Sequence, residues 1–273
     1  MLVPAPSYPL FEFLASIQDV KLVSYPLLYD HGWQVDLHAL SEAITPRTRA
    51  ILVVHPNNPT GSFVKPAEME ILDSLCRERE LALVADEVFL DYALNGVERP
   101  SFAGPRQALT FTLSGVSKIC ALPQMKLAWI VTGGPPELVR NALARLEVIA
   151  DTYLSVSTPL QLALPEFLAR RDEIQRQVKE RVATNLAELD RQLAEEESVR
   201  RLDVEGGWYA VLRVPATRPD EDLAIELLGQ QSAIVHPGHF YDFPREGYLV
   251  VSLITPAEAL AEGLKRLLAS VFS

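Results

Sequence analysis

Lys118 stands out among the side chains that could do chemistry. A strand-compatible run from Leu109 to Leu113 ends at small residues, and Lys118 follows where the chain turns, with no further charge until Lys126. Most lysines are solvated surface charges, which is the ordinary interpretation of any single one. An ammonium group in apolar surroundings loses hydration, so its pKa falls and the neutral amine can attack carbonyl carbons. The segment therefore predicts a lysine that forms a Schiff base.

Two polar side chains, Asp86 and Asn58, follow other apolar runs. Asp86 comes after residues 81–85, and Asn58 comes after residues 51–54. The simpler interpretations are that Asp86 caps the segment after it and that Asn58 closes the Asn-Pro turn. A buried carboxylate, however, needs a cation or several donors. Ligands of parallel sheets lie beyond the carboxyl ends of the strands, so Asp86, Asn58 and Lys118 could converge on one crevice.

Three short motifs together resemble the class I/II aminotransferases, pyridoxal-phosphate enzymes of fold type I in the aspartate aminotransferase superfamily. In chain order they are His55–Gly61 (HPNNPTG), Ala85–Phe89 (ADEVF), and Ser114–Lys118 (SGVSK) with Lys126. Each motif alone is a weak signal. Their order, and their positions at the ends of apolar runs, make the combination specific, and the resemblance extends from Leu2 to the C-terminus.

The resemblance implies roles for five residues. Lys118 would hold pyridoxal 5'-phosphate as a Schiff base and move the proton at the substrate α-carbon. Asp86 would pair with the protonated pyridine nitrogen, and Asn58 would hydrogen bond to the phenolic oxygen. Tyr8 would stack on the pyridine ring, although it could also be a packing aromatic beside a proline turn. Lys126, otherwise a surface charge, would bind the phosphate where the family carries an arginine, offering a point charge in place of a bidentate fork.

Two positions depart from the family pattern. Phe89 stands where many members have a tyrosine that donates to the phenolic oxygen. Val250 stands where the common pattern carries the arginine that binds the substrate α-carboxylate. Arg213, Arg245 and His239 are candidate substitutes, although each can also be an ordinary surface or loop residue. The identity of the substrate stays open.

The hydrophobic pattern predicts alternating strands and helices. Apolar runs at 51–54 and 81–85 flank a helical segment from Pro66 to Arg79, a rhythm typical of a right-handed crossover in a parallel sheet. Residues 127–132 are a further predicted strand. The link from Lys118 is too short for a crossover helix, so this strand is expected to pair antiparallel.

These elements predict a three-layer α/β/α fold with a mostly parallel sheet and a smaller α+β C-terminal domain. The large cofactor-binding domain is expected over residues 1–172 and the small domain over residues 173–273, with strands at 233–235 and 248–253 among others. The family's phosphate loop and first strand have no counterpart here. We therefore expect the fold-type-I domain to be incomplete at its N-terminus, lacking on the order of a hundred residues.

Net charge and the spacing of cysteines and histidines argue against several classes of protein. The net charge of −11 and the pI near 5.0 argue against nucleic-acid or anionic-membrane partners. Cys76 and Cys120 lie far apart outside any CxxC spacing, which favours reduced thiols in a cytoplasmic protein. His236 and His239 flank a Pro-Gly break without a third ligand nearby, so no metal site is expected. Neither a signal peptide nor a membrane span is evident.

The function expected from the resemblance is pyridoxal-phosphate-dependent transfer of an amino group between an amino acid and a 2-oxo acid, in a homodimer, with Lys118 as catalytic residue. One alternative is a pyridoxal-phosphate lyase on the same fold, which releases ammonia or a side-chain fragment without an oxo-acid acceptor. Another is a non-catalytic aminotransferase-like binding module. The missing phosphate loop and Val250 favour that module, whereas Lys118, Asp86 and Asn58 count against it.

Overall fold

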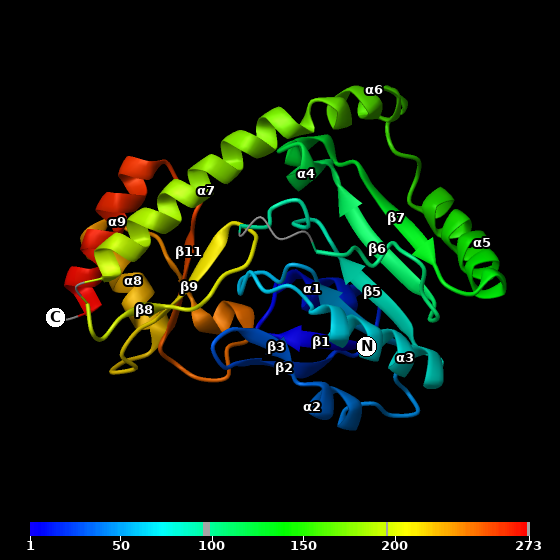
Figure 1. Cartoon of the computed structure of the whole chain (residues 1–273), viewed down its shortest axis with the longest axis horizontal. Coiled ribbons are helices and arrows are strands. Elements are labelled where there is room, and N and C mark those ends of the chain that lie inside the picture. Colours follow the sequence, from blue (N-terminus) through cyan, green and yellow to red (C-terminus); the bar gives the residue numbers. More distant parts are fainter. Residues whose placement is uncertain (95–98, 195, 272–273) are drawn as a thin grey trace.

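The computed structural model describes residues 1–94, 99–194 and 196–271. Its larger sheet has seven strands (Figure 1). In spatial order they are β3 (Trp33–Val35), β2 (Val23–Tyr29), β1 (Leu2–Ala5), β4 (Ala50–Val54), β5 (Ala82–Asp86), β6 (Thr110–Gly115) and β7 (Ala128–Gly133). The five central strands are parallel, and β3 and β7 pair antiparallel at the two edges. The antiparallel pairing predicted for 127–132 is confirmed.

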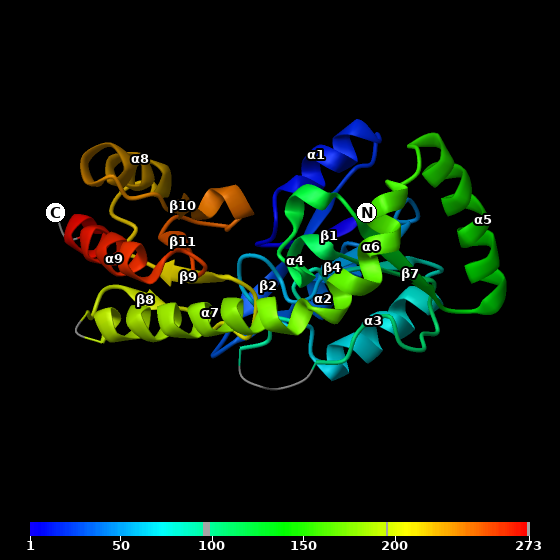
Figure 2. The same cartoon turned by 90° about the horizontal axis from the view of Figure 1, so that it is seen from above.

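Helices cover both faces of this sheet, as Figure 2 shows for α1 (Leu10–Ile17) and α3 (Pro66–Glu78). On the α3 face, Ile51, Leu72 and Leu83 are fully buried in one cluster, because strands covered on both sides must be apolar throughout. Helix α3 begins at Pro66, as predicted. The remaining helices of this part are α2 (Leu37–Glu42), α4 (Val116–Ile119), η1 (Pro123–Met125), α5 (Pro136–Thr152) and α6 (Thr158–Ala169).

The second sheet has four antiparallel strands. In spatial order they are β10 (His236–Pro237), β11 (Tyr248–Ser252), β9 (Tyr209–Arg213) and β8 (Arg200–Arg201). Helices α7 (Arg171–Leu193), α8 (Asp220–Gln231) and α9 (Ala257–Val271) pack on it, and η2 (Gly238–Tyr241) follows β10. Leu212, Leu249 and Leu264 belong to the buried cluster between the sheet and its helices. In Figure 1, α7 runs along the upper side of the molecule from α6 to the second sheet.

The strand predicted at 233–235 is wrong. Ser232 ends α8 in the left-handed conformation, with φ 52°, and the Ala233 N–H donates to the Leu227 carbonyl oxygen at 3.0 Å. This helix C-cap uses the backbone donor that a strand would need, so pairing with β11 starts only at His236. None of the helices in the three described ranges is both long and apolar enough to cross a bilayer.

Candidate active site

Lys118 sits on α4, the one-turn helix that follows β6. The turn requires a glycine, because a Cβ on Gly115 would lie 2.8 Å from the carbonyl oxygen of Leu127, the residue before β7. The Tyr92 hydroxyl donates to the Lys118 carbonyl oxygen at 2.7 Å and fixes the backbone of the helix. The small residues of the SGVSK motif thus allow β6 to turn tightly and present the lysine.

The Lys118 amine lies against aromatic rings. Its Nζ atom is 5.1 Å from the Trp208 ring centroid and 5.4 Å from that of Phe89. Within the described ranges, no carboxylate forms an ion pair with it. Burial lowers the pKa of Lys118, and the nearby charge of Asp86 opposes that shift. A lysine in this setting holds its amine in the nucleophilic form more readily than a solvated one.

Asp86 is the last residue of β5, and its largely buried carboxylate has few hydrogen-bond partners among the described residues. Its Oδ1 atom accepts a hydrogen bond from the Val88 N–H at 3.1 Å. Burial raises the pKa of Asp86, while that hydrogen bond and the charge of Lys118 oppose the shift. The next residue, Glu87, is fully satisfied, since it accepts from the Ser101 hydroxyl at 2.6 Å and the Phe102 N–H at 2.5 Å. Of the two adjacent carboxylates, that of Asp86 therefore has more oxygen lone pairs left to accept hydrogen bonds from a ligand.

Asn58 lies in the loop after β4, with its side chain buried. Its Oδ1 atom has no hydrogen-bond partner among the described residues. Asn58 lines a small cavity together with Phe89, Trp208 and Tyr209, and two of these rings also contact Lys118. The structure therefore brings Asn58, Asp86 and Lys118 to the carboxyl end of the parallel sheet, as the sequence predicts.

Tyr8 stands at the margin of this group. It follows β1, is 41% exposed, and packs edge-on against Phe11 at 6.2 Å. The loop that carries it is tied to the Asn58 loop, since Ser7 donates to the Asn57 amide at 2.8 Å and Asn57 donates to the Pro6 carbonyl oxygen at 3.0 Å. The Tyr8 ring is thus held next to the Asn58 loop.

Lys126, like Tyr8, is an exposed residue. It follows η1 in the left-handed conformation, with φ 53°, and its side chain is solvated. No contact within the described part of the chain joins it to the other four. The structure therefore gathers three of the five residues closely, leaves Tyr8 at the edge and leaves Lys126 in solvent.

A cavity of about 370 Å³ opens beside Lys118. Its walls come from α4, α7 and the segment just before β9, and they are mostly apolar side chains such as Ile174, Val178 and Trp208. Arg181 and Lys118 are the two charged residues that line it. This volume suits a small ligand, with Arg181 available for a carboxylate.

Trp208 and Arg181 are site residues that the sequence analysis did not identify. The two glycines before Trp208, Gly206 and Gly207, could have indicated a close approach of the backbone at this position. A Cβ on Gly206 would lie 2.9 Å from the Tyr92 carbonyl oxygen, so only glycine allows this approach. Glu205 holds the same loop, accepting from the Phe63 N–H at 2.9 Å and from Lys65 at 2.5 Å. Arg181 lies on the exposed side of α7 and gives no local signal.

The two positions that depart from the family pattern are both buried. Phe89 packs on Trp208 at 5.1 Å between ring centroids and offers no hydroxyl. Val250 lies in a hydrophobic cluster with Trp33 and Tyr241. None of the three candidate substitutes, Arg213, Arg245 and His239, lines the cavity beside Lys118.

Lys118→Met is expected to raise the melting temperature of the cofactor-free chain at neutral pH. Burial depresses the folded-state pKa of Lys118 below its ordinary value of 10.5. Below the folded pKa the lysine is charged in both states, so the whole cost of burying the charge is present. Above the folded-state pKa the lysine of the folded chain is neutral. The free-energy cost of burying its charge then falls with rising pH and vanishes as the pH approaches 10.5. Scanning fluorimetry from neutral pH to about pH 10 is expected to show a shrinking gain.

The exposed Lys179 on α7 provides the control. Lys179→Met is expected to change the melting temperature little at any pH. A gain for Lys118→Met that stays constant with pH, or an equal gain for Lys179→Met, would contradict the burial of the Lys118 charge.

No cluster of three or more His, Cys, Asp or Glu side chains suited to a metal ion occurs among the residues that the structure describes. The groups that can still bind a ligand are instead the amine of Lys118, the carboxylate of Asp86 and the amide of Asn58. That donor set suits an organic molecule with a carbonyl and a protonated ring nitrogen better than it suits a metal ion.

Comparison with known sequences agrees with this chemistry. The sequence profile described as aminotransferase class I and II matches residues 1–267. The glutamate-pyruvate aminotransferase AlaA of Escherichia coli (strain K12) is 35% identical over 166 residues, covering 60% of this chain and 41% of that protein. The alanine aminotransferase of Mycobacterium tuberculosis (strain H37Rv) is 27% identical over 274 residues, covering 98% of this chain and 64% of that protein. The chain thus spans less than two thirds of the length of either relative.

Solved aminotransferases share the fold. Tyrosine aminotransferase from Leishmania infantum matches with a TM-score of 0.90 at 20% identity, covering 98% of this chain and 67% of that one. Alanine aminotransferase from Pyrococcus furiosus matches with a TM-score of 0.86 at 24% identity, covering 99% and 70%. The predicted fold-type-I α/β class is confirmed by this likeness. Because the family profile extends over residues 1–267, the chain belongs to the aminotransferase class I and II family.

Proposed function

We propose that this chain transfers amino groups between an amino acid and a 2-oxo acid, with pyridoxal 5'-phosphate as cofactor and Lys118 as the residue that attaches it. The observation that carries the proposal is the Lys118 amine, which lies on aromatic rings beside a cavity and has its pKa lowered by burial. Family membership supports the reaction class. One structural neighbour is a putative aminotransferase described as bound to pyridoxal phosphate.

The residues present fit this cofactor. Lys118 has an amine without an ion pair among the described residues, Asp86 has a carboxylate with one hydrogen bond, and the Asn58 Oδ1 atom has no described partner. Lys118 would attach the cofactor, Asp86 would hold the proton on its ring nitrogen, and Asn58 would meet its phenolic oxygen. Tyr8 would stack on the ring, and Lys126 would face the phosphate. When bound, pyridoxal phosphate supplies an electron sink for the substrate α-carbon.

Lys118 would have a second task, as the base that moves the proton at the substrate α-carbon. A depressed pKa leaves more of the amine neutral near physiological pH, and a neutral amine can take the proton from the substrate α-carbon and return it. Trp208 and Phe89 exclude water from one side of the amine. The charge of Asp86, held in a largely buried place, is stabilised when it faces a proton on the ring nitrogen.

We infer that Arg181 binds the substrate carboxylate in place of the arginine missing at Val250. It is the one guanidinium group among the described residues that line the Lys118 cavity. Arg181→Gln is expected to raise KM about tenfold or more with little change in kcat, because a lost charged hydrogen bond weakens substrate and transition state alike. Lys179→Gln, two residues away on the same helix, is expected to leave KM unchanged. An equal KM for the Arg181 variant and the parent would contradict this role.

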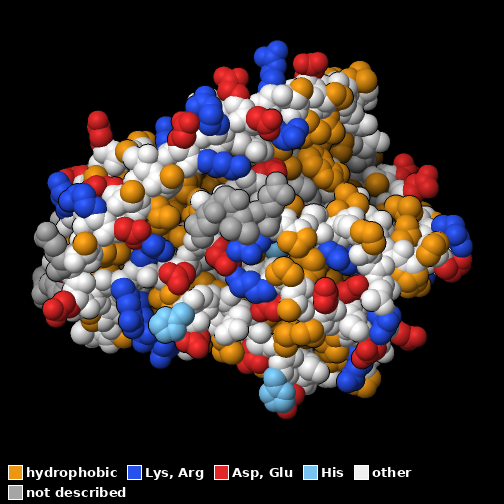
Figure 3. Space-filling view, in the orientation of Figure 1, with side chains coloured by type: hydrophobic (Ala, Val, Ile, Leu, Met, Phe, Trp, Pro, Cys, Tyr) orange, Lys and Arg blue, Asp and Glu red, His pale blue; other side chains and the backbone are white. Residues whose placement is uncertain are grey.

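A homodimer in the cytoplasm is part of the proposal. Figure 3 shows hydrophobic side chains gathered at the upper right, in the region of β7 and α6. Leu143, Val148 and Tyr153 on and after α5 are at least half exposed, at 50%, 66% and 70%, which suits a covered surface. Cys76 and Cys120 are buried free thiols, which suits a reducing compartment.

Amino transfer is tested by incubating the purified chain, pyridoxal phosphate and [15N]glutamate with pyruvate, because pyruvate appears in the names of two relatives. Transfer is expected to yield [15N]alanine in amounts that depend on pyruvate. A lyase would release [15N]ammonium without needing pyruvate, and a non-catalytic binding module would yield neither product.

A further inference from the structure

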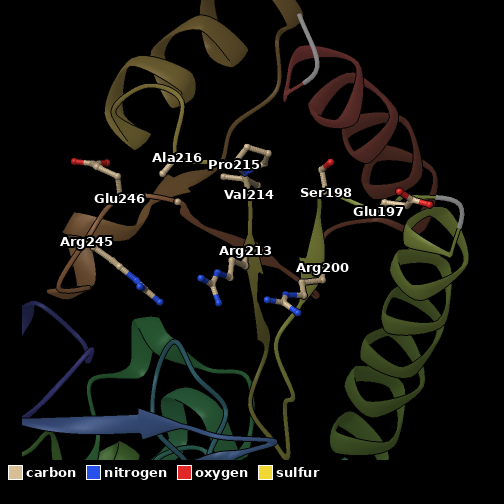
Figure 4. A pocket seen from close by; sticks show the side chains of 10 residues that line it. Glu197, Ser198, Arg200, Arg213, Val214, Pro215, Ala216, Arg245 and Glu246 are labelled. Atoms are coloured by element: carbon tan, nitrogen blue, oxygen red, sulfur yellow. The ribbon is translucent and has the colours of Figure 1, made fainter.

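A second cavity, of about 460 Å³, lies at the far end of the four-stranded sheet. It shares no lining residue with the cavity beside Lys118. Three of its lining residues are arginines: Arg200 on β8, Arg213 at the end of β9, and Arg245 in the loop before β11. In Figure 4 the guanidinium groups of Arg213 and Arg245 point toward one another, and Arg200 lies beside Arg213.

The sheet holds these positive charges close together. Arg200 is directly opposite Arg213 in the antiparallel pairing of β8 and β9. Arg213 in turn is opposite Tyr248, whose ring lies 6.0 Å from the Arg245 guanidinium and whose hydroxyl accepts from Arg245 at 3.3 Å. Like charges directly opposite on neighbouring strands destabilise a sheet, and an arginine cannot relieve the repulsion by losing its proton.

No acidic side chain among the described residues forms an ion pair with these three arginines. The chain carries 36 acidic against 25 basic residues, and other arginines of this part are paired, Arg201 with Asp190 and Arg218 with Glu226. Neither Arg200, Arg213 nor Arg245 forms such a pair within the described ranges. Figure 4 shows Glu197 and Glu246, the two acidic residues of the lining, directed away from the guanidinium groups.

The Glu246 carboxylate is already engaged elsewhere. It accepts a hydrogen bond from the Asp220 N–H at 2.7 Å, at the first residue of α8. Within the described ranges it forms no ion pair with Arg200, Arg213 or Arg245. Three guanidinium groups that have no ion pair among the described residues thus meet at one cavity, in a protein of net charge −11.

We propose that this cavity binds a small molecule carrying two or more negative charges on phosphate or carboxylate groups. Guanidinium groups bind both kinds of oxygen in bidentate fashion, and three of them suit more than one anionic group. Val214 and Pro215 give the cavity an apolar wall for the rest of the molecule. The site is separate from the Lys118 cavity and does not depend on the proposed amino transfer.

The test is calorimetric titration of the whole chain, without cofactor, with inorganic pyrophosphate and in parallel with citrate, at matched ionic strength. Saturable binding of one molecule per chain is expected, and the tighter of the two probes identifies the anionic group. Arg200→Gln and Arg213→Gln are each expected to weaken that binding about tenfold or more, because each removes a charged hydrogen bond. Arg79→Gln, an exposed arginine on the other part of the chain, is expected to leave it unchanged.

A second readout separates a binding role from a structural one. Without added anion, Arg200→Gln is expected to melt at the same temperature as the parent or higher, because it relieves like-charge repulsion. Absence of saturable binding for both probes would overturn the proposal, and so would unchanged affinity in both arginine variants. Binding lost in Lys126→Gln but kept in the arginine variants would place the anion at the proposed cofactor site and also overturn it.

Discussion

Replacing Lys118 with alanine is expected to lower the rate of amino transfer by about three orders of magnitude or more, because a positioned general base alone contributes roughly 10²–10⁴-fold. The variant loses both tasks that we propose for the amine, attachment of the cofactor and movement of the proton at the substrate α-carbon. The side chain is partly buried against Trp208 and Phe89 and forms no ion pair within the described ranges, so the fold does not depend on its charge.

The matched control is Lys179→Ala, which removes an exposed lysine from α7. Rates are measured with saturating amino donor and 2-oxo acid, and circular dichroism verifies the fold of both variants. The control is expected to keep the parent rate. A Lys118→Ala variant that retains more than about a tenth of the parent rate would be incompatible with a base at this position.

Asp86→Asn is expected to lower the rate about 10²–10³-fold, the loss typical when one preorganised electrostatic contact to the reacting system is removed. Attachment of the cofactor at Lys118 is expected to persist, since the amine is untouched. Asparagine has nearly the same shape but cannot hold a proton on the ring nitrogen. The loss is therefore expected in kcat, with KM changing little.

The same substitution is expected to raise the melting temperature of the cofactor-free chain at neutral pH. Burial raises the pKa of Asp86 above its ordinary 3.8, so the folded chain bears a cost for the charged carboxylate at neutral pH. That cost falls as the pH drops below the folded pKa and is absent below 3.8, so the gain is expected to disappear in acid.

The adjacent Glu87 supplies the contrast. Glu87→Gln is expected to leave the rate within a few-fold of the parent, because the Glu87 carboxylate is already occupied by the Ser101 hydroxyl and the Phe102 N–H. Equal effects of the two substitutions on rate would contradict a special role for Asp86.

The parts of the fold that are predictable from the sequence are those set by local pattern. The apolar run of β4 and the proline at the start of α3 are visible in the chain itself, and they locate a strand and a helix correctly. The meeting of Asn58, Asp86 and Lys118 follows from one rule, that the carboxyl ends of parallel strands share an edge.

What the sequence could not predict depends on contacts between distant segments. Trp208 reaches Lys118 because Glu205 ties its loop to Lys65 and Phe63, which lie 140 and 142 residues before Glu205 in the chain. Arg181 enters the cavity only through the packing of α7. The three-arginine cavity requires the register of β8 on β9, which no local pattern reveals. The roles of Tyr8, Lys126 and the other site residues remain predictions.

The most direct test of the account is to find where pyridoxal phosphate attaches. The purified chain is mixed with the cofactor, reduced with borohydride and digested with trypsin, and the labelled peptide is identified by mass spectrometry. The account predicts one labelled peptide, residues 107–126, uncleaved at Lys118 because that lysine carries the label. Label at Lys126, label scattered over exposed lysines such as Lys179, or no label would contradict the assignment of Lys118.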